Sequence, residues 1–98
     1  GLDEARIRAI EAVTDIPLVI HGGSGVPLSQ RKHLAATSRI CKVNIGTELR
    51  MAFGAALRRA VNADPERFDR VAILKETQAP VCEAARAVIR GLGASGRA

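Results

Sequence analysis

The stretch from Ile16 to Pro27 constrains the fold more than any other part of the sequence. A short apolar run, Leu18 to Ile20, is typical of a buried strand, and a histidine and a glycine-rich turn follow it directly. Pro27 then precedes a segment with helical character, because proline suits the first position of a helix. A strand, a glycine-rich turn and a helix in this order present backbone N–H groups to an anion. The stretch therefore predicts an anion-binding turn in an α/β fold.

A second unit of the same kind follows the first. The apolar run Ile40–Asn44 predicts another strand, and the turn Asn44–Thr47 leads into a helix that we expect Thr47 to cap. That helix has one apolar stripe, formed by Leu49, Ala52, Phe53, Ala56, Leu57, Ala60 and Val61. Two such units in succession predict a parallel sheet or a β/α barrel, in which neighbouring strand ends lie together. The two turns could then converge on one anionic ligand, most simply a phosphate.

Further helices are expected at both ends of the chain. Asp3–Val13 has an amphipathic pattern, and a last helical region runs from about Val71 to Leu92, with a break near Thr77–Ala79 because Pro80 interrupts it. Both strands resemble strands that are buried on two faces, so we expect them to need further strands beside them. Since a complete β/α barrel takes about 200 residues or more, we expect these 98 residues to be its last quarter.

The composition excludes several classes of partner. The net charge is +5, but basic and acidic residues are mixed along the helices, and Arg31 and Lys32 are expected on a solvated helix face with His33. There are two Phe, no Tyr and no Trp, so no stacking platform for nucleic acid exists. Cys41 and Cys82 are expected to be buried, reduced thiols, which favours a cytoplasmic protein. No apolar run approaches the ~18 residues of a membrane span.

The turn after the first strand carries the candidate chemistry. His21 alone is not a zinc site, because catalytic zinc needs three protein ligands, and it could be an ordinary strand-end histidine. Gly22–Gly25 could cradle a phosphate or form only a tight connection, since the lysine of a P-loop and the Gly-x-Ser-x-Gly pattern of a hydrolase are both absent. The residues alone support the phosphate-binding end of a β/α barrel and no specific reaction.

Two motifs in order, His21–Pro27 and Lys42–Arg50 with Ala52 and Phe53, resemble the C-terminal part of class II ketose-bisphosphate aldolases. These are the zinc-dependent fructose- and tagatose-bisphosphate aldolases. The resemblance extends over nearly the whole chain, including the tail Gly93–Ala98. It implies an α/β fold in which residues 1–98 are the C-terminal quarter of one TIM (β/α)8 barrel domain: strands seven and eight with their helices, plus C-terminal helices.

The resemblance also implies roles for individual residues. His21 matches the last of three zinc-binding histidines, and Asn44 matches a catalytic asparagine that contacts the substrate near its reacting carbon. The residues implied to bind the substrate and its phosphate are Gly22, Gly23, Ser24, Asn44, Gly46 and Thr47. The expected cofactor is Zn²⁺, with a monovalent cation, Na⁺ or K⁺, close to the glycine-rich turn.

The activity implied is reversible aldol cleavage of a ketose (bis)phosphate to dihydroxyacetone phosphate and an aldehyde, as a lyase of carbohydrate metabolism and glycolysis. The full-length protein is expected to be a cytoplasmic homo-oligomer, a dimer or a tetramer. The family's catalytic Asp and other two zinc histidines lie upstream, so the 98-residue chain is expected to be inactive alone. A non-catalytic aldolase-like subunit and an unrelated phosphate-binding module are the alternatives.

Two positions depart from the family's pattern. Gln78 stands where the family usually has an Arg that binds the distal phosphate of the substrate, and Pro80 stands where the family usually continues a helix. We therefore expect a phosphorylated ketose as substrate, with altered recognition of its distal end.

Overall fold

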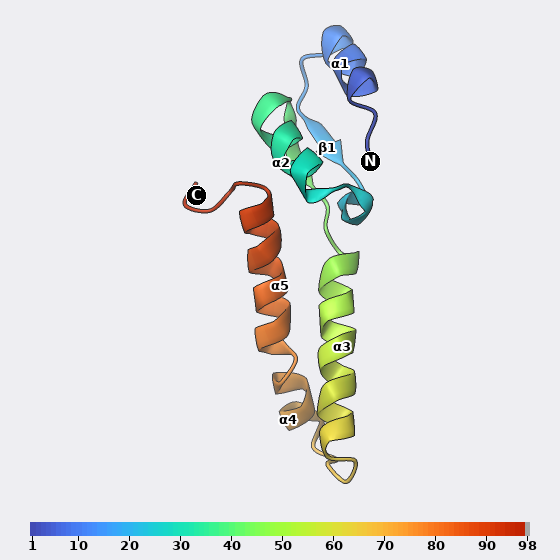
Figure 1. The fold of residues 1–98 in the computed structure, drawn as a ribbon, viewed down its shortest axis with the longest axis vertical. Coiled ribbons are helices and arrows are strands. Elements are labelled where there is room, and N and C mark those ends of the chain that lie inside the picture. Colours follow the sequence, from blue (N-terminus) through green and yellow to red (C-terminus); the bar gives the residue numbers. More distant parts are fainter. Residues whose placement is uncertain (98) are drawn as a thin grey trace. The chain divides into compact units, whose positions relative to one another are not determined.

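A computed structural model describes residues 1–97, which form two compact units (Figure 1). The first unit contains Gly1–Ile45 together with the tail from Ile89, and the second is Gly46–Val88. The elements, in chain order, are α1 (Glu4–Val13), β1 (Leu18–Ile20), a 3₁₀ turn (Gly23–Gly25), α2 (Leu28–Thr37), β2 (Ile40–Val43), α3 (Thr47–Ala63), α4 (Arg70–Lys75) and α5 (Gln78–Gly91).

The sheet of the first unit consists of β1 and β2, which pair in parallel and are joined through α2. Leu18 lies opposite Ile40 and Ile20 lies opposite Val43, with one irregularity in register after Leu18. The first strand is Leu18–Ile20, the apolar run expected from the sequence, and Pro17 just before it has no N–H to donate to a ladder. The α/β class and the parallel pairing are thus confirmed, while the complete barrel stays a prediction.

The core of the first unit lies between the sheet and α2. Leu34 has no exposed surface, because it projects from α2 onto the apolar side chains of both strands. The buried members of this cluster are Ile20, Val26, Leu34 and Ile40, and the partly buried residues packed against it are Leu2, Ile7, Leu18 and Val43. Val26 belongs to this core and is also the residue that ends the glycine-rich turn, so the core lies against that turn.

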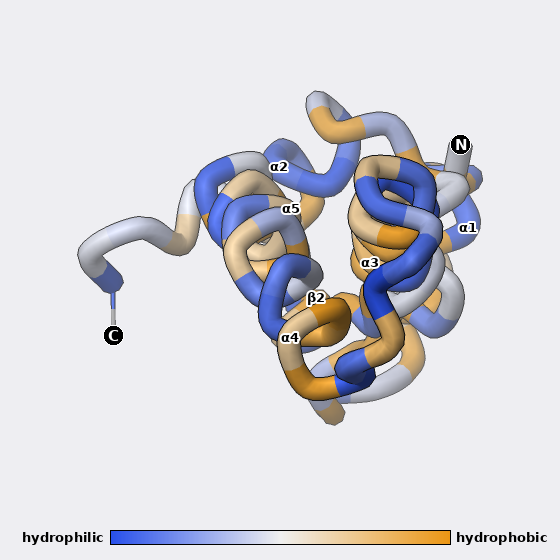
Figure 2. Tube along the Cα trace, turned by 90° about the horizontal axis from the view of Figure 1, so that it is seen from below, coloured by the Kyte–Doolittle hydropathy of each residue, from blue (hydrophilic) through white to orange (hydrophobic). Residues whose placement is uncertain are grey.

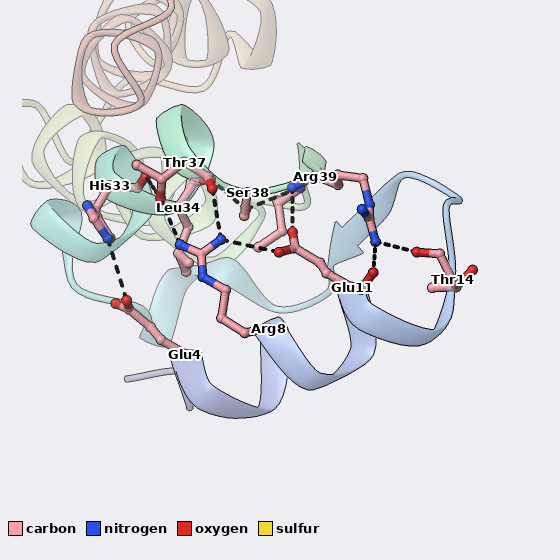
Figure 3. Close-up of polar contacts among 10 residues, drawn as sticks. Glu4, Arg8, Glu11, Thr14, His33, Leu34, Thr37, Ser38 and Arg39 are labelled. Carbon is pink, nitrogen blue, oxygen red and sulfur yellow. Dashed lines mark hydrogen bonds and ion pairs between the residues drawn. The ribbon is translucent and has the colours of Figure 1, made fainter.

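Polar contacts fasten α1 to the turn between α2 and β2 (Figure 3). The N–H of Arg39 donates to Glu11 Oε1 at 2.6 Å, and Arg8 Nη1 donates to the carbonyl of Thr37 at 2.8 Å. The Arg39 guanidinium also donates to the carbonyls of Glu11 and Thr14. The backbone N–H of Arg39, assisted by the Arg8 and Arg39 charges, holds the pKa of Glu11 below its ordinary value.

The second unit consists of helices. Asp69 caps α4 by accepting from the N–H of Val71 at 3.0 Å, and Asp64 starts the preceding turn by accepting from the N–H of Glu66 at 3.1 Å. Hydrophobic residues recur along α3 in bands separated by hydrophilic ones, as Figure 2 shows, and Ala56 and Ala60 are its buried members. The predicted stripe on α3 is therefore only partly covered within this chain.

Several expectations about helix ends need correction. Thr47 was expected to cap α3, but it is the first helical residue, and Gly46 precedes it without a side-chain cap. The predicted break near Thr77–Ala79 is present, although it falls between Lys75 and Gln78. Pro80 consequently lies in the first turn of α5, where its missing N–H has no intrahelical partner to lose.

The two cysteines are exposed, so the expectation of buried thiols is wrong. Cys41 projects from a sheet of two strands, and its Sγ approaches the carbonyl oxygen of Leu18 at 3.5 Å without being covered. Cys82 lies on α5, none of whose described residues is buried. Within residues 1–97, no helix is both long enough and apolar enough to cross a membrane.

Candidate functional site

The glycine-rich turn lies beside Asn44, the residue that follows β2. The N–H of Asn44 donates to the carbonyl of Ile20 at 2.8 Å, which extends the strand pairing by one residue. The N–H of Gly23 then donates to the carbonyl of Asn44 at 3.0 Å. Both backbone groups of Asn44 are therefore held by the end of β1 and the turn that follows it. The predicted meeting of the glycine-rich turn with the end of the second strand is confirmed.

Two of the three glycines in the turn are required by geometry. Gly22 has a φ of 72°, a left-handed conformation that L side chains rarely adopt. Gly23 is buried, and a Cβ there would overlap Val43 Cγ1 and lie 3.3 Å from the carbonyl oxygen of Asn44. Gly25 has neither constraint, because a Cβ there would meet no atom within 4 Å. The small size of Gly23 is what lets the glycine-rich turn approach Asn44.

A buried arginine lies against the glycine-rich turn. Arg31 is only 4% exposed, and its Nε donates to the carbonyl of Val26 at 2.7 Å while Nη2 donates to the carbonyl of Ser24 at 3.3 Å. The expectation that Arg31 is solvated is therefore wrong. The sequence did contain a signal, since Arg31 precedes the core residue Leu34 by three positions and so shares its helix face.

His21 is exposed and follows the last residue of β1. It borders a hollow of about 230 Å³ whose other lining residues are apolar and come from both strands and from the segment that contains α1. The structure gives the imidazole of His21 no hydrogen bond or ion pair to any residue of the range 1–97. By contrast, His33 lies 3.6 Å from Glu4 and is exposed, as expected (Figure 3).

His21 is the zinc ligand that the resemblance implies for this chain. Nowhere in the described range 1–97 do three His, Cys, Asp or Glu side chains gather as metal ligands. The accessible imidazole of His21, at the end of a parallel strand, fits one ligand position of a zinc site. Further ligands would have to come from outside this range of residues.

The turn before α3 brings a cation beside a predicted phosphate-binding residue. Arg50 Nη2 donates to Thr47 Oγ1 at 3.2 Å, and a Cβ on Gly46 would lie 3.2 Å from Arg50 Nη1. Gly46 thus leaves room for the guanidinium. The motif that contains Arg50 was noted in the sequence, but its position beside Thr47 was not predicted.

A comparison with known protein families agrees with this geometry. The family model described as "Fructose-bisphosphate aldolase class-II" matches residues 1–97. Because the match extends over almost all of the 98 residues, the chain belongs to this family, and the resemblance drawn from the two motifs is confirmed.

Proposed function

We propose that this class II aldolase segment is part of an enzyme that reversibly cleaves a ketose (bis)phosphate to dihydroxyacetone phosphate and an aldehyde. Membership of the family supports aldolase chemistry in general. The observation that carries the specific proposal is the contact between the glycine-rich turn and Asn44, through the Gly23–Asn44 hydrogen bond of 3.0 Å. It places a predicted phosphate-binding turn next to a residue predicted to contact the reacting carbon.

Phosphate binding is assigned to the backbone of the turn and to the start of α3. Gly22, Gly23 and Ser24 form a turn without charged side chains, so its recognition of a phosphate rests on the Ser24 hydroxyl and on backbone N–H groups other than that of Gly23, which donates to Asn44. Gly46 and Thr47 lie at the N-terminus of a 17-residue helix, where the dipole favours an anion. Fixing the phosphate would align the ketose and remove its freedom to rotate before the reaction.

His21 would supply one ligand to the zinc ion. When bound, zinc polarises a carbonyl oxygen and stabilises the negative charge that develops there. The imidazole of His21 is suited to hold the ion because it is exposed and follows directly on a strand. Asn44 can orient substrate with its side-chain amide, since its own N–H and carbonyl are fixed by Ile20 and Gly23. The proposal also includes a monovalent cation, Na⁺ or K⁺, bound close to the glycine-rich turn.

We extend the proposal to the full-length protein that would contain this chain. Residues 1–98 would supply strands seven and eight of a TIM barrel domain, in a cytoplasmic homo-oligomer that is a dimer or a tetramer. The purified 98-residue chain is expected to bind no catalytic zinc and to show no retro-aldol turnover, because a single histidine is too few ligands. Measurable cleavage by the isolated chain would contradict this.

The test compares two histidines in the full-length protein. His21→Ala is expected to lower the zinc content from one equivalent to a small fraction and to abolish aldol cleavage, measured by elemental analysis and a coupled assay. His33→Ala is the matched control, because His33 is an exposed histidine on α2 that lies 3.6 Å from Glu4. Full zinc and activity in His21→Ala would overturn the proposal, and zinc binding without turnover in the wild type would indicate a non-catalytic subunit.

The distal end of the substrate is a separate question. Gln78 is exposed and begins α5, and it stands where the family usually carries a phosphate-binding Arg. We therefore propose that a ketose monophosphate is used about as well as a bisphosphate. Comparing kcat/KM for the two substrates tests this, and a strong preference for fructose 1,6-bisphosphate would contradict it.

A further inference from the structure

Arg31 donates hydrogen bonds to the glycine-rich turn, and the proposed reaction gives this arginine no role. We propose that Arg31 is a positioning residue, which holds the turn in the shape that binds the substrate's phosphate without touching the substrate itself. The inference rests on the proposed function, because it assumes that the turn binds a phosphate. Its evidence is the pair of hydrogen bonds from Arg31 to the carbonyls of Ser24 and Val26.

These two bonds control the direction of the turn's peptide groups. A peptide unit is planar and trans, so its C=O and the next residue's N–H point in opposite directions. Holding the Ser24 carbonyl toward Arg31 therefore aims the N–H of Gly25 away from the arginine. The 2.7 Å bond from Arg31 holds the carbonyl of Val26. Pro27 follows Val26 and has no N–H. The carbonyl is therefore the group of this peptide that a hydrogen bond can hold, and the bond fixes the end of the turn.

The other side of the turn is held independently. The N–H of Gly23 donates to the Asn44 carbonyl at 3.0 Å, and the N–H of Val26 donates to the Gly23 carbonyl at 3.0 Å. With Arg31 in place, the turn is fixed both toward β2 and toward α2. A binding turn whose shape is set before the ligand arrives loses less conformational freedom on binding.

Arginine is the side chain suited to this position. Its planar guanidinium carries several N–H donors in a fixed fork, so it can reach two carbonyls at once, which the ammonium of a lysine does less well. Hydrogen bonds from a guanidinium are stronger than those from a neutral donor, so the two carbonyls are held firmly. Lys32, the next residue, is exposed and has no recorded hydrogen bond to the turn within residues 1–97, so it offers a matched control.

The experiment uses the zinc-loaded full-length protein with Arg31→Met, Arg31→Lys and Lys32→Met. The measured quantities are kcat, KM for the ketose phosphate, Ki for inorganic phosphate as a competitor, and zinc content. Arg31→Met is expected to raise both KM and Ki about tenfold, equivalent to about 1.4 kcal/mol, with kcat and zinc content little changed. Arg31→Lys is expected to recover part of the loss, and Lys32→Met should match the wild type.

The possible failures can be told apart. Wild-type Ki and KM in Arg31→Met would overturn the role of Arg31, and so would a fall in kcat at constant KM. If Arg31→Met does not fold, the comparison of Arg31→Lys with Lys32→Met decides, and equal Ki values in those two variants would overturn the role. If inorganic phosphate does not inhibit even the wild type, the proposed phosphate binding by the turn is wrong, and the role of Arg31 is then wrong as well.

Discussion

The strand-end region, Leu18–Asn44, and the helical unit, Gly46–Val88, are built on different principles. In the strand-end region, residues distant in sequence hold one another, as Gly23 and Asn44 do. In the helical unit, the side-chain hydrogen bonds of Arg67, Asp69 and Thr77 join residues within nine positions of one another. A turn fixed by distant contacts can be shaped before a ligand binds, whereas a helix start such as Thr47 depends on local geometry. The comparison therefore predicts that substitutions in the strand-end region cost more.

The largest expected difference is between two large apolar side chains. Leu34 is fully buried, whereas Phe68 in the helical unit is 94% exposed. Leu34→Ala should lower the free energy of unfolding by about 2–5 kcal/mol because it leaves a cavity behind the glycine-rich turn. Phe68→Ala should change it by less than about 0.5 kcal/mol. Chemical denaturation of the full-length variants measures both, and equal losses would break the comparison.

The next difference concerns glycines. Gly23→Ala should cost about 1–3 kcal/mol and weaken phosphate binding, since the new Cβ meets Val43 and the backbone of Asn44. Gly25→Ala, in the same turn, should be neutral because the space around it is open. Gly46→Ala should cost less than Gly23→Ala, since it meets only the flexible end of Arg50. Thermal denaturation ranks the three variants, and a neutral Gly23→Ala would contradict the close packing of the turn against Asn44.

A smaller effect is expected at a helix cap in the helical unit. Asp69→Ala removes the acceptor of the Val71 N–H and should destabilise α4 by about 1 kcal/mol. Asp69→Asn keeps an acceptor in place and should recover most of that loss. Hydrogen exchange of the α4 amides measures the change locally, and unchanged protection in Asp69→Ala would show that the cap does not matter there.

The smallest effect depends on pH. The folded-state pKa of Glu11 is lowered, chiefly by the Arg39 N–H, so its stabilising contribution is present above the unfolded-state pKa. That contribution is lost as the pH falls through the folded-state pKa. Glu11→Gln should therefore lower Tm at pH 7 and have a diminishing effect in acid. A Tm difference that stays constant with pH would contradict the assignment.

Sequence patterns predicted the strand-end region well because its signals are strong. An apolar run ending in His21 and a cluster of glycines specify a strand and a turn, and the repeat of that unit at Asn44 predicted parallel pairing. The burial of Arg31 was missed because a charged side chain on a polar helix is read as solvated. Its carbonyl partners, on Ser24 and Val26, are backbone groups that no sequence pattern displays.

Predictions about burial failed where the fold exposes an apolar surface. Cys41 and Cys82 were expected to be buried because their neighbours are apolar, yet both are exposed. A two-stranded sheet and a helix with no buried residue cannot cover them. Local sequence predicts which surfaces tend to be buried, but burial itself depends on which elements pack against those surfaces.

The central proposal is that the glycine-rich turn after β1 binds the phosphate of a sugar phosphate, beside Asn44 and His21. A crystal structure of the zinc-loaded full-length protein with dihydroxyacetone phosphate tests it most directly. We expect the phosphate within hydrogen-bond distance of the Gly22–Ser24 turn, with zinc on the His21 imidazole. A phosphate bound elsewhere, or a zinc ion that His21 does not touch, would contradict it.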